Sequence, residues 1–386
     1  MMKTVTVLGC TGSIGCSTVD LLHQSGDEVA VRVLVGGRNV SLLAEQAKAL
    51  RAEQAVIADE ALLPELKSLL AGTDVKASGG RAAVIEAAGV PADWTMAAIT
   101  GAAGLEPTLA AVKNGRTVAL ANKEALVCAG DVMLRAVKDA GATLLPVDSE
   151  HNAVFQAMAD RQEDQVEKII LTASGGPFRT STLEQMEAAS PAQALKHPTW
   201  TMGAKISIDS ASMFNKGLEV IEAARIFGLT EDRIDVLVHP QSVVHGMVQY
   251  TDGSLIAQMG SADMRIPIAH CLAWPKRMAT TSPRLDLATF GTLVFEAPDP
   301  VRFPALRLAR QALRDGGAAS TILSAANEVA VEAFLNNRIG FLDIPRIVEA
   351  VMTALGAPAI NDLDAVLHWD AEARRAAEER VLKRAA

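Results

Sequence analysis

Short apolar runs alternate with amphipathic stretches along the first 150 residues of the chain. The runs that we interpret as strands cover residues 4–8, 30–35, 55–58, 96–99, 117–120 and 142–145. Short runs rich in apolar and β-branched residues are typical of buried strands. Helical periodicity follows the first run, and this alternation predicts an α/β fold whose N-terminal part is a Rossmann-like, doubly wound sheet.

The pattern changes after residue 150. We expect strands at 166–171 and 205–210, a helix at 213–227, and a hairpin in which Thr251-Asp252-Gly253 separates the runs 236–249 and 254–259. Beyond residue 300 the predicted elements are helices, at 305–314, 321–336, 343–354 and 362–384. We therefore predict four parts: a doubly wound α/β part (1–148), a central α+β part (149–290), a proline-rich linker (291–304) and a C-terminal helical domain (305–386).

Composition narrows the class of protein. A chain of 386 residues with 49% hydrophobic residues can bury a large core. The formal charge of −9 argues against a nucleic-acid partner, and no apolar run is long enough to predict a membrane span. The apolar run at the N-terminus soon breaks into glycines and continues as a helix that carries Asp20, so we expect mature structure there rather than a signal peptide. Four cysteines without CxxC spacing suit reduced thiols, so we expect a cytoplasmic protein. They are Cys10, Cys16, Cys128 and Cys271.

A glycine-rich loop joins the first strand to the first helix. Its glycines are Gly9, Gly12 and Gly15, in GxxGxxG spacing, and strand–loop–helix is the context that a dinucleotide fingerprint requires. The second strand ends in Gly-Gly-Arg-Asn rather than in an acidic residue. The guanidinium of Arg38 matches a 2′-phosphate and favours NADP over NAD, although a solvated loop arginine is the alternative.

Polar residues follow two further strands of the predicted sheet. The segment 122–124 is Asn-Lys-Glu, and Asp148 and Glu150 flank Ser149 after the run 142–145. In extended chain, carboxylates two residues apart point to the same side, where a divalent cation would relieve their repulsion. The alternatives are a helix cap for Asn-Lys-Glu and an acidic surface turn for the second group.

Residues 172–203 contain two irregular segments. Ser174 begins a Ser-Gly-Gly-Pro turn, which is either a simple tight turn or a loop whose donors meet an oxyanion. Residues 190–203 have neither helical nor strand periodicity but carry Trp200, which is typical of a lid that closes over a ligand. His197 would move with this lid, or would otherwise be solvated.

Asn215 and Glu219 are four residues apart and lie on one face of the predicted helix, with Lys216 beside them. Apolar neighbours predict that Glu219 is partly buried and needs a partner. It would join Asp148 and Glu150 as a third carboxylate ligand for Mg²⁺ or Mn²⁺, unless it forms an ordinary Lys–Glu pair.

The chain resembles the 1-deoxy-D-xylulose 5-phosphate reductoisomerase family over nearly its whole length. The resemblance rests on six motifs in order: GCTGSIG at 9–15, LANKE at 120–124, PVDSEH at 146–151, TASGGPF at 172–178, HPTWTMG at 197–203 and NKGLE at 215–219. Cys10 stands where many relatives have serine, which we expect to leave the role of the loop unchanged.

The resemblance implies that residues 1–148 are an NADPH-binding domain and that residues 149–290 are a catalytic domain with a flap at about 195–205. It also implies a homodimer that uses NADPH and a divalent cation, and it assigns roles to residues. NADPH would be bound by Thr11, Gly12, Ser13, Ile14, Gly37, Arg38, Asn39, Asn122, Glu124 and Gly203. The metal would be bound by Asp148, Glu150 and Glu219. The substrate would be bound by Lys123, Ser149, Glu150, Ser174, His197, Trp200, Ser210, Asn215, Lys216 and Glu219. The catalytic group would comprise Lys123, Asp148, Glu150 and Glu219.

The implied reaction rearranges 1-deoxy-D-xylulose 5-phosphate and then reduces the resulting aldehyde with NADPH to 2-C-methyl-D-erythritol 4-phosphate, a step of non-mevalonate isoprenoid synthesis. Two rivals stay open. Another NADP-dependent oxidoreductase, such as a homoserine or semialdehyde dehydrogenase, would have no use for three carboxylates beside Ser, Asn and Lys donors. A non-catalytic NADPH-binding regulator would have no use for a complete metal and phosphate site.

Overall fold

The computed structural model describes residues 2–158, 163–200 and 202–385, which form two compact units. Unit 1 comprises residues 1–125, 133–148 and 263–282, and unit 2 comprises residues 126–132, 149–262 and 283–386. Thr201, which belongs to the predicted flap, lies outside the described residues. No helix in the described ranges combines the length and apolarity that a membrane span needs.

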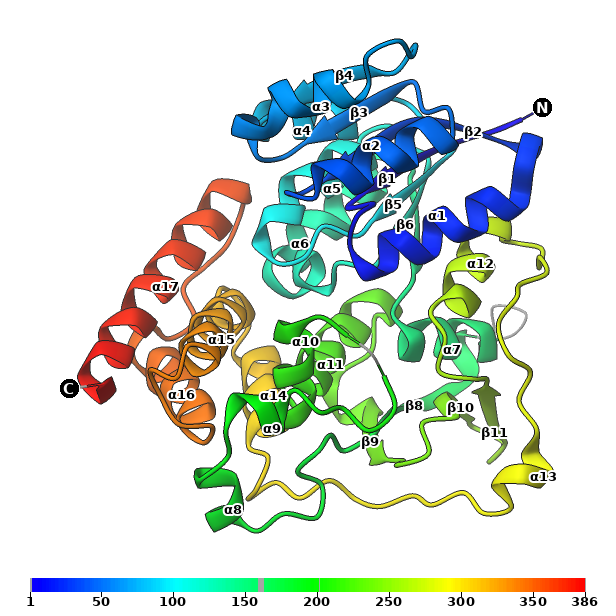
Figure 1. Ribbon diagram of the computed structural model, residues 1–386. Coiled ribbons are helices and arrows are strands. Elements are labelled where there is room, and N and C mark those ends of the chain that lie inside the picture. The colour runs from blue at the N-terminus through cyan, green and yellow to red at the C-terminus, as the bar shows by residue number, and fades with distance from the viewer. Residues whose placement is uncertain (1, 159–162, 201, 386) are drawn as a thin grey trace. The chain divides into compact units, whose positions relative to one another are not determined.

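Unit 1 is built on a seven-stranded parallel sheet with the order β4-β3-β2-β1-β5-β6-β7 (Figure 1). Its strands are β1 (Lys3–Leu8), β2 (Val29–Gly36), β3 (Gln54–Ile57), β4 (Lys76–Gly79), β5 (Trp94–Ala97), β6 (Thr117–Leu120) and β7 (Thr143–Pro146). Its helices are α1 (Ser13–Ser25), α2 (Val40–Ala49), α3 (Leu63–Leu69), α4 (Arg81–Ala88), α5 (Leu105–Val112), most of α6 (Lys123–Ala140) and α12 (Arg265–Ala273). The predicted doubly wound sheet is confirmed.

In this order β1 lies between β2 and β5, so β2 to β4 are added on one side of β1 and β5 to β7 on the other. The chain therefore reverses direction across the sheet between β1 and β5, and this is the point where doubly wound sheets bind ligands beyond their carboxyl ends. The loops after β1, β2, β5 and β6, which contain most of the predicted cofactor residues, lie at that edge. The short strand β4, with only partly buried residues, was not predicted.

Unit 2 contains a mixed four-stranded sheet with the order β11-β10-β8-β9. Its strands are β8 (Val166–Ala173), β9 (Ile234–Val238), β10 (Val244–Tyr250) and β11 (Leu255–Met259). The β8–β9 pair is parallel, and β10 pairs antiparallel with β8 and with β11. The predicted hairpin is therefore β10–β11, whereas the first part of the run 236–249 belongs to β9.

The helices of unit 2 are α7 (Ser149–Ala157), α8 (Leu183–Glu187), α9 (Pro191–Ala194), α10 (Ala204–Ser212), α11 (Phe214–Phe227), α13 (Leu287–Phe290), α14 (Ala305–Asp315), α15 (Ala319–Leu335), α16 (Asp343–Leu355) and α17 (Leu363–Ala385). One hydrophobic core runs from Val166 on β8 through α11 to Val381 on α17. The four predicted C-terminal helices are confirmed within one or two residues (Figure 1). The predicted limits of the four domains stay a prediction.

Two local predictions were wrong. Residues 205–210 form part of helix α10, not a strand, although Ile206 and Ile208 alternate with polar residues. Lys205 and Asp209 form an i,i+4 ion pair that only a helix permits. The extended-chain argument for Asp148 and Glu150 also fails, because Ser149 begins α7 and Glu150 lies in its first turn.

Candidate functional site

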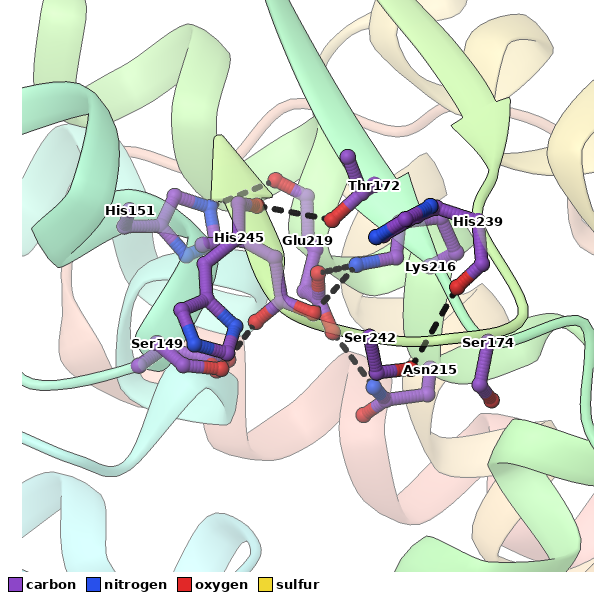
Figure 2. Close-up of polar contacts among 12 residues, drawn as sticks. Ser149, His151, Thr172, Ser174, Asn215, Lys216, Glu219, His239, Ser242 and His245 are labelled. Carbon is purple, nitrogen blue, oxygen red and sulfur yellow. Dashed lines mark hydrogen bonds and ion pairs between the residues drawn. The ribbon is translucent and has the colours of Figure 1, made fainter. Parts of the chain in front are cut away.

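Glu219 is the centre of a polar cluster in unit 2 (Figure 2). Its side chain is completely buried on α11, as predicted from its apolar neighbours. Asn215 Nδ2 donates a hydrogen bond to Oε1, and Lys216 Nζ donates one to Oε2. Both carboxylate oxygens are therefore held by residues of the same helix, at spacings of four and three residues.

Lys216 connects Glu219 to the first turn of α7. Its ammonium Nζ lies 2.9 Å from Oε1 of Glu150, and Oε2 of Glu150 accepts a 2.5 Å hydrogen bond from Ser149. Burial alone would lower the pKa of Lys216, but the two carboxylates raise it above its ordinary value. One positive charge thus faces two carboxylates, and a carboxylate oxygen of Glu150 lies within 4.8 Å of one of Glu219.

The predicted phosphate residues lie on segments that meet α11. Ser174 directly follows β8, and its Oγ accepts the backbone N–H of Gly176 at 3.1 Å. A bond of 2.8 Å joins the same Oγ to His197 Nε2. Ser210 lies on α10, and Met213 in the left-handed conformation (φ 64°) turns the chain sharply from α10 into α11. Ser210 and Asn215 therefore flank one tight turn.

The segment after His197 folds back on that histidine. Nδ1 of His197 accepts the backbone N–H groups of Thr199 at 3.2 Å and Trp200 at 2.9 Å. Because Nδ1 accepts, the neutral ring carries its proton on Nε2 and donates it to Ser174. Burial lowers the pKa of His197, which favours this neutral form. The Trp200 ring lies 6.1 Å from the buried ring of His245.

Unit 1 contains the glycine loop in the predicted strand–loop–helix context. Gly9 has φ +89°, and a Cβ there would lie 2.6 Å from the carbonyl oxygen of Ala98. A Cβ on Gly15 would lie 2.2 Å from the carbonyl oxygen of Gly9. Glycine is thus required at both positions, and α1 begins at Ser13 after the N-cap residue Gly12, which offers no side-chain cap. Such a helix N-terminus with a close-fitting loop suits a pyrophosphate.

The other predicted cofactor residues of unit 1 lie at the same sheet edge. Arg38 is highly exposed after β2, with its Nε 3.2 Å from Asp59 Oδ2, and Asn39 caps α2. Asn122 caps α6 by accepting the N–H of Ala125, and its Nδ2 donates to Gly101 O at 3.0 Å. The helix-cap alternative for Asn-Lys-Glu is therefore correct for Asn122.

Lys123 and Asp148 are paired at the carboxyl ends of β6 and β7. Lys123 Nζ lies 2.5 Å from Asp148 Oδ2, and both side chains are largely buried. Asp148 ends unit 1 and is followed in the chain by Ser149 and Glu150, the first residues of α7.

Comparison with known proteins decides the family. Three family models match successive parts of the chain: 1-deoxy-D-xylulose 5-phosphate reductoisomerase at residues 5–130, its C-terminal domain at 144–227, and the DXP reductoisomerase C-terminal domain at 259–376. The 1-deoxy-D-xylulose 5-phosphate reductoisomerase of Gluconobacter oxydans (strain 621H) is 70% identical over 99% of this chain and 94% of its own length. The enzyme of Rhodospirillum centenum is 60% identical over 98% of this chain and 94% of its own length.

The chain belongs to the 1-deoxy-D-xylulose 5-phosphate reductoisomerase family. The reductoisomerase from Zymomonas mobilis in complex with NADPH superposes with a TM-score of 0.94, at 52% identity over 99% of each chain. A DOX-P reductoisomerase in complex with NADPH, fosmidomycin and magnesium gives a TM-score of 0.93, at 40% identity over 98% of each chain. The predicted fold, enzyme class and family reaction are confirmed. The NADPH and magnesium bound in these related structures agree with the predicted cofactors, NADPH and a divalent cation.

The sequence argument did not assign a role to His151, which follows Glu150 in the PVDSEH motif. The ring is completely buried, and Nε2 lies 2.9 Å from the backbone oxygen of Glu219. Its Nδ1 faces Oε2 of Glu222 at 3.5 Å. A histidine next to a candidate metal ligand, on the buried side of a helix, was the signal that could have identified it. His239 and His245 bond to backbone carbonyls, as expected of structural histidines.

Proposed function

We propose that the family reaction, the NADPH- and divalent-metal-dependent conversion of 1-deoxy-D-xylulose 5-phosphate to 2-C-methyl-D-erythritol 4-phosphate, takes place at the cluster around Glu219. The observation that carries this proposal is the buried Glu219 carboxylate, which Asn215 and Lys216 fix through both oxygens and which shares Lys216 with Glu150. A merely structural Lys–Glu pair would need no second carboxylate.

The donor set fits a hard divalent cation. Glu150 and Glu219 carry two negative charges against the single ammonium of Lys216, so the cluster retains net negative charge. Asp148, which precedes Glu150 by two residues, would add a third carboxylate ligand. When bound by Asp148, Glu150 and Glu219, the cation would supply Lewis-acid polarisation of the substrate's oxygen atoms.

The remaining residues bind and orient the substrate. Hydroxyl, amide and ammonium donors suit its phosphate, and the phosphate grip provides remote binding energy that positions the reacting carbons. The donors are those of Ser174, His197, Ser210, Asn215 and Lys216. Ser149 and Lys123 would contact the substrate backbone, and Lys123 and Glu150 would move protons. Trp200, on the flap at about 195–205, would cover the ligand and exclude water.

NADPH would supply the hydride for the reduction. The unit 1 loop at Thr11, Gly12, Ser13 and Ile14 would bind its pyrophosphate region, because the required glycines bring backbone amides close to the ligand. Gly37, Arg38 and Asn39 would bind the adenosine phosphate end. Asn122 and Glu124 would lie along the cofactor, and Gly203 would contact it from the flap.

The test is NADPH oxidation by purified protein that has been stripped of metal with a chelator. We expect turnover of 1-deoxy-D-xylulose 5-phosphate only after Mg²⁺ or Mn²⁺ is restored. Dephosphorylated 1-deoxy-D-xylulose is the matched control and should turn over far more slowly. Turnover at the full rate without metal, or none with it, would show that the proposal is wrong.

We also propose that the chain acts as a homodimer in the cytoplasm. Two large apolar side chains of the edge strand β11, Leu255 and Ile256, are 53% and 44% exposed, and such an edge is a template for pairing with a second copy. The four cysteines, all of which lie in the described ranges, form no disulfide, and this suits a reducing compartment. Ile256→Lys should convert the dimer to monomer in analytical ultracentrifugation, whereas Leu382→Lys, at a 58% exposed position on α17, should not. A monomeric wild-type protein would contradict the proposal.

A further inference from the structure

Helix α10 contains a buried carboxylate that the reaction does not use. Asp209 has 1% of its surface exposed, although a charged side chain in a core is costly unless it is paired. Its two oxygens have different partners. Oδ2 lies 2.9 Å from Lys205 Nζ, one turn earlier on the same helix, and Oδ1 accepts a 2.7 Å hydrogen bond from Asn327 Nδ2.

Asn327 comes from a distant part of the chain and lies in an unfavourable place for an amide. It is completely buried in the middle of α15, where Ala325, Ala326 and Ala330 belong to the hydrophobic core. Its Oδ1 has no hydrogen-bond partner among the described residues, so the amide contributes to the core only through Nδ2. An apolar residue of similar volume would avoid the cost of that orphaned oxygen. The hydrogen bond from Nδ2 to Asp209 offsets the cost of burying this amide.

The Asp209–Asn327 hydrogen bond holds α10 next to Ser210, one of the predicted substrate residues. Ser210 directly follows Asp209, and the turn at Met213 carries the chain from there into Asn215 and Lys216. The bond to Lys205 is internal to α10 and partly exposed, so it cannot fix the helix to anything else. The bond from Asn327 crosses to α15, 118 residues further along the chain, and is fully buried.

We propose that Asn327 is a positioning residue of this reductoisomerase, whose hydrogen bond to Asp209 sets the position of Ser210 and so the affinity for the substrate's phosphate. The inference rests on the proposed function in one respect, the contact of Ser210 with phosphate. A shift of about 1 Å at a binding group can change a rate by two orders of magnitude, so losing this bond should be visible in kinetics.

The experiment compares Asn327→Leu with Ser324→Ala, a matched control on the same helix. Ser324 is also buried, and its hydroxyl has no hydrogen-bond partner in the described part of the chain. We expect Asn327→Leu to raise the KM for 1-deoxy-D-xylulose 5-phosphate about tenfold or more, with the KM for NADPH changed less than about twofold. The inhibition constant of inorganic phosphate, as a competitor of the substrate, should rise in parallel. Ser324→Ala should change none of these constants.

Ser210→Ala distinguishes a failure of the positioning role of Asn327 from a failure of the proposed contact between Ser210 and the substrate's phosphate. If Ser210→Ala raises the substrate KM and the phosphate inhibition constant while folded Asn327→Leu leaves both unchanged, the positioning role of Asn327 is wrong and the phosphate site stands. If Ser210→Ala changes neither constant, the phosphate contact itself is wrong and the inference falls with it. Should Asn327→Leu not fold, Asn327→Ser removes the same bond with a smaller polar side chain, and the same two constants decide.

Discussion

Lys216 Nζ lies 2.9 Å from Oε1 of Glu150, a residue 66 positions earlier in the chain. The same ammonium bonds to Glu219, so one nearly buried cation compensates two carboxylates. Removing one partner of a buried ionic group leaves an uncompensated charge, which costs far more than the pair contributes. The stability of this cluster should therefore depend on Lys216 and, in its absence, on a metal ion.

Lys216→Gln should lower the free energy of unfolding by about 3–5 kcal/mol in the presence of a chelator, because Glu219 then stays buried without a cation. Millimolar Mg²⁺ should restore part of the loss, since binding to the native state alone stabilises it. Urea unfolding with and without Mg²⁺ measures both effects. Lys168→Gln is the control, because its 2.6 Å pair with Asp235 is half-exposed and should be worth less than about 1 kcal/mol.

The pKa of Lys216 determines how this difference varies with pH. Because the folded-state pKa is raised, the contribution of its charge is fully present below the unfolded value of about 10.5 and is lost only as pH rises through the folded value. Lys216 should therefore stay charged from about pH 6 to 9, and its own titration should not change the difference between wild type and Lys216→Gln in that range. If Lys216→Gln lowered the free energy of unfolding by no more than Lys168→Gln does, Lys216 would not be the cation that compensates the buried Glu219.

Glu219→Gln should weaken the dependence on metal by removing a negatively charged ligand. We expect the metal concentration for half-maximal activity to rise by about tenfold or more, with a lower rate at saturation. Titration of chelator-treated enzyme with Mn²⁺ measures this shift, and Glu332→Gln, an exposed position on α15, serves as control. A variant with the wild-type rate and the wild-type metal requirement would show that Glu219 is not a ligand.

The sequence revealed the parts of the fold and site that depend on local pattern. Short runs rich in apolar and β-branched residues located six of the seven strands of unit 1, whereas β4, which has no buried residue, offered no such run. The burial of Glu219 followed from its neighbours Val220 and Ile221. The assignment of 205–210 to a strand failed because Ile206 and Ile208 alternate, although the Lys205–Asp209 spacing is that of a helix.

Contacts between distant segments were beyond sequence reasoning. Nothing in the pattern indicates that Lys216 reaches Glu150, or that His151 bonds to the backbone of Glu219. The pairing of Asp209 with Asn327 has the same origin, because only the packing of α10 against α15 brings them together. The family motifs identified the residue types of the site, and the structure adds which of them hold one another in place.

Arg38→Ser should reduce the preference for NADPH over NADH by about 10- to 100-fold. The guanidinium is 86% exposed and forms a 3.2 Å surface pair with Asp59, so it is available to a 2′-phosphate at little cost. The loss should appear as a higher KM for NADPH with an unchanged KM for NADH. Arg32→Ser, which removes an arginine within β2 that is paired with Glu53, is the control. If the preference for NADPH over NADH did not change, Arg38 would be a solvated loop arginine that does not bind the 2′-phosphate.

Acid should weaken substrate binding through His197. Its Nδ1 accepts the backbone N–H groups of Thr199 and Trp200, and its Nε2–H donates to Ser174. A second proton would bind Nδ1, where it would face those two N–H donors and break the turn before Trp200. Burial lowers the pKa of His197. The stabilisation from the neutral ring is therefore present above the unfolded value of about 6.5 and is lost as pH falls from there through the folded value.

The expected observation is a fall in kcat/KM for the substrate below about pH 6.5 that His197→Asn removes. The asparagine Oδ1 can accept the same backbone N–H groups but does not titrate, and it does not reach Ser174, so the KM should be higher at every pH. His368→Asn, at an exposed position on α17, should keep the acid limb of the wild type. An acid limb that survives in His197→Asn would assign the titration to another group, with His245, whose ring lies beside Trp200, the next to test.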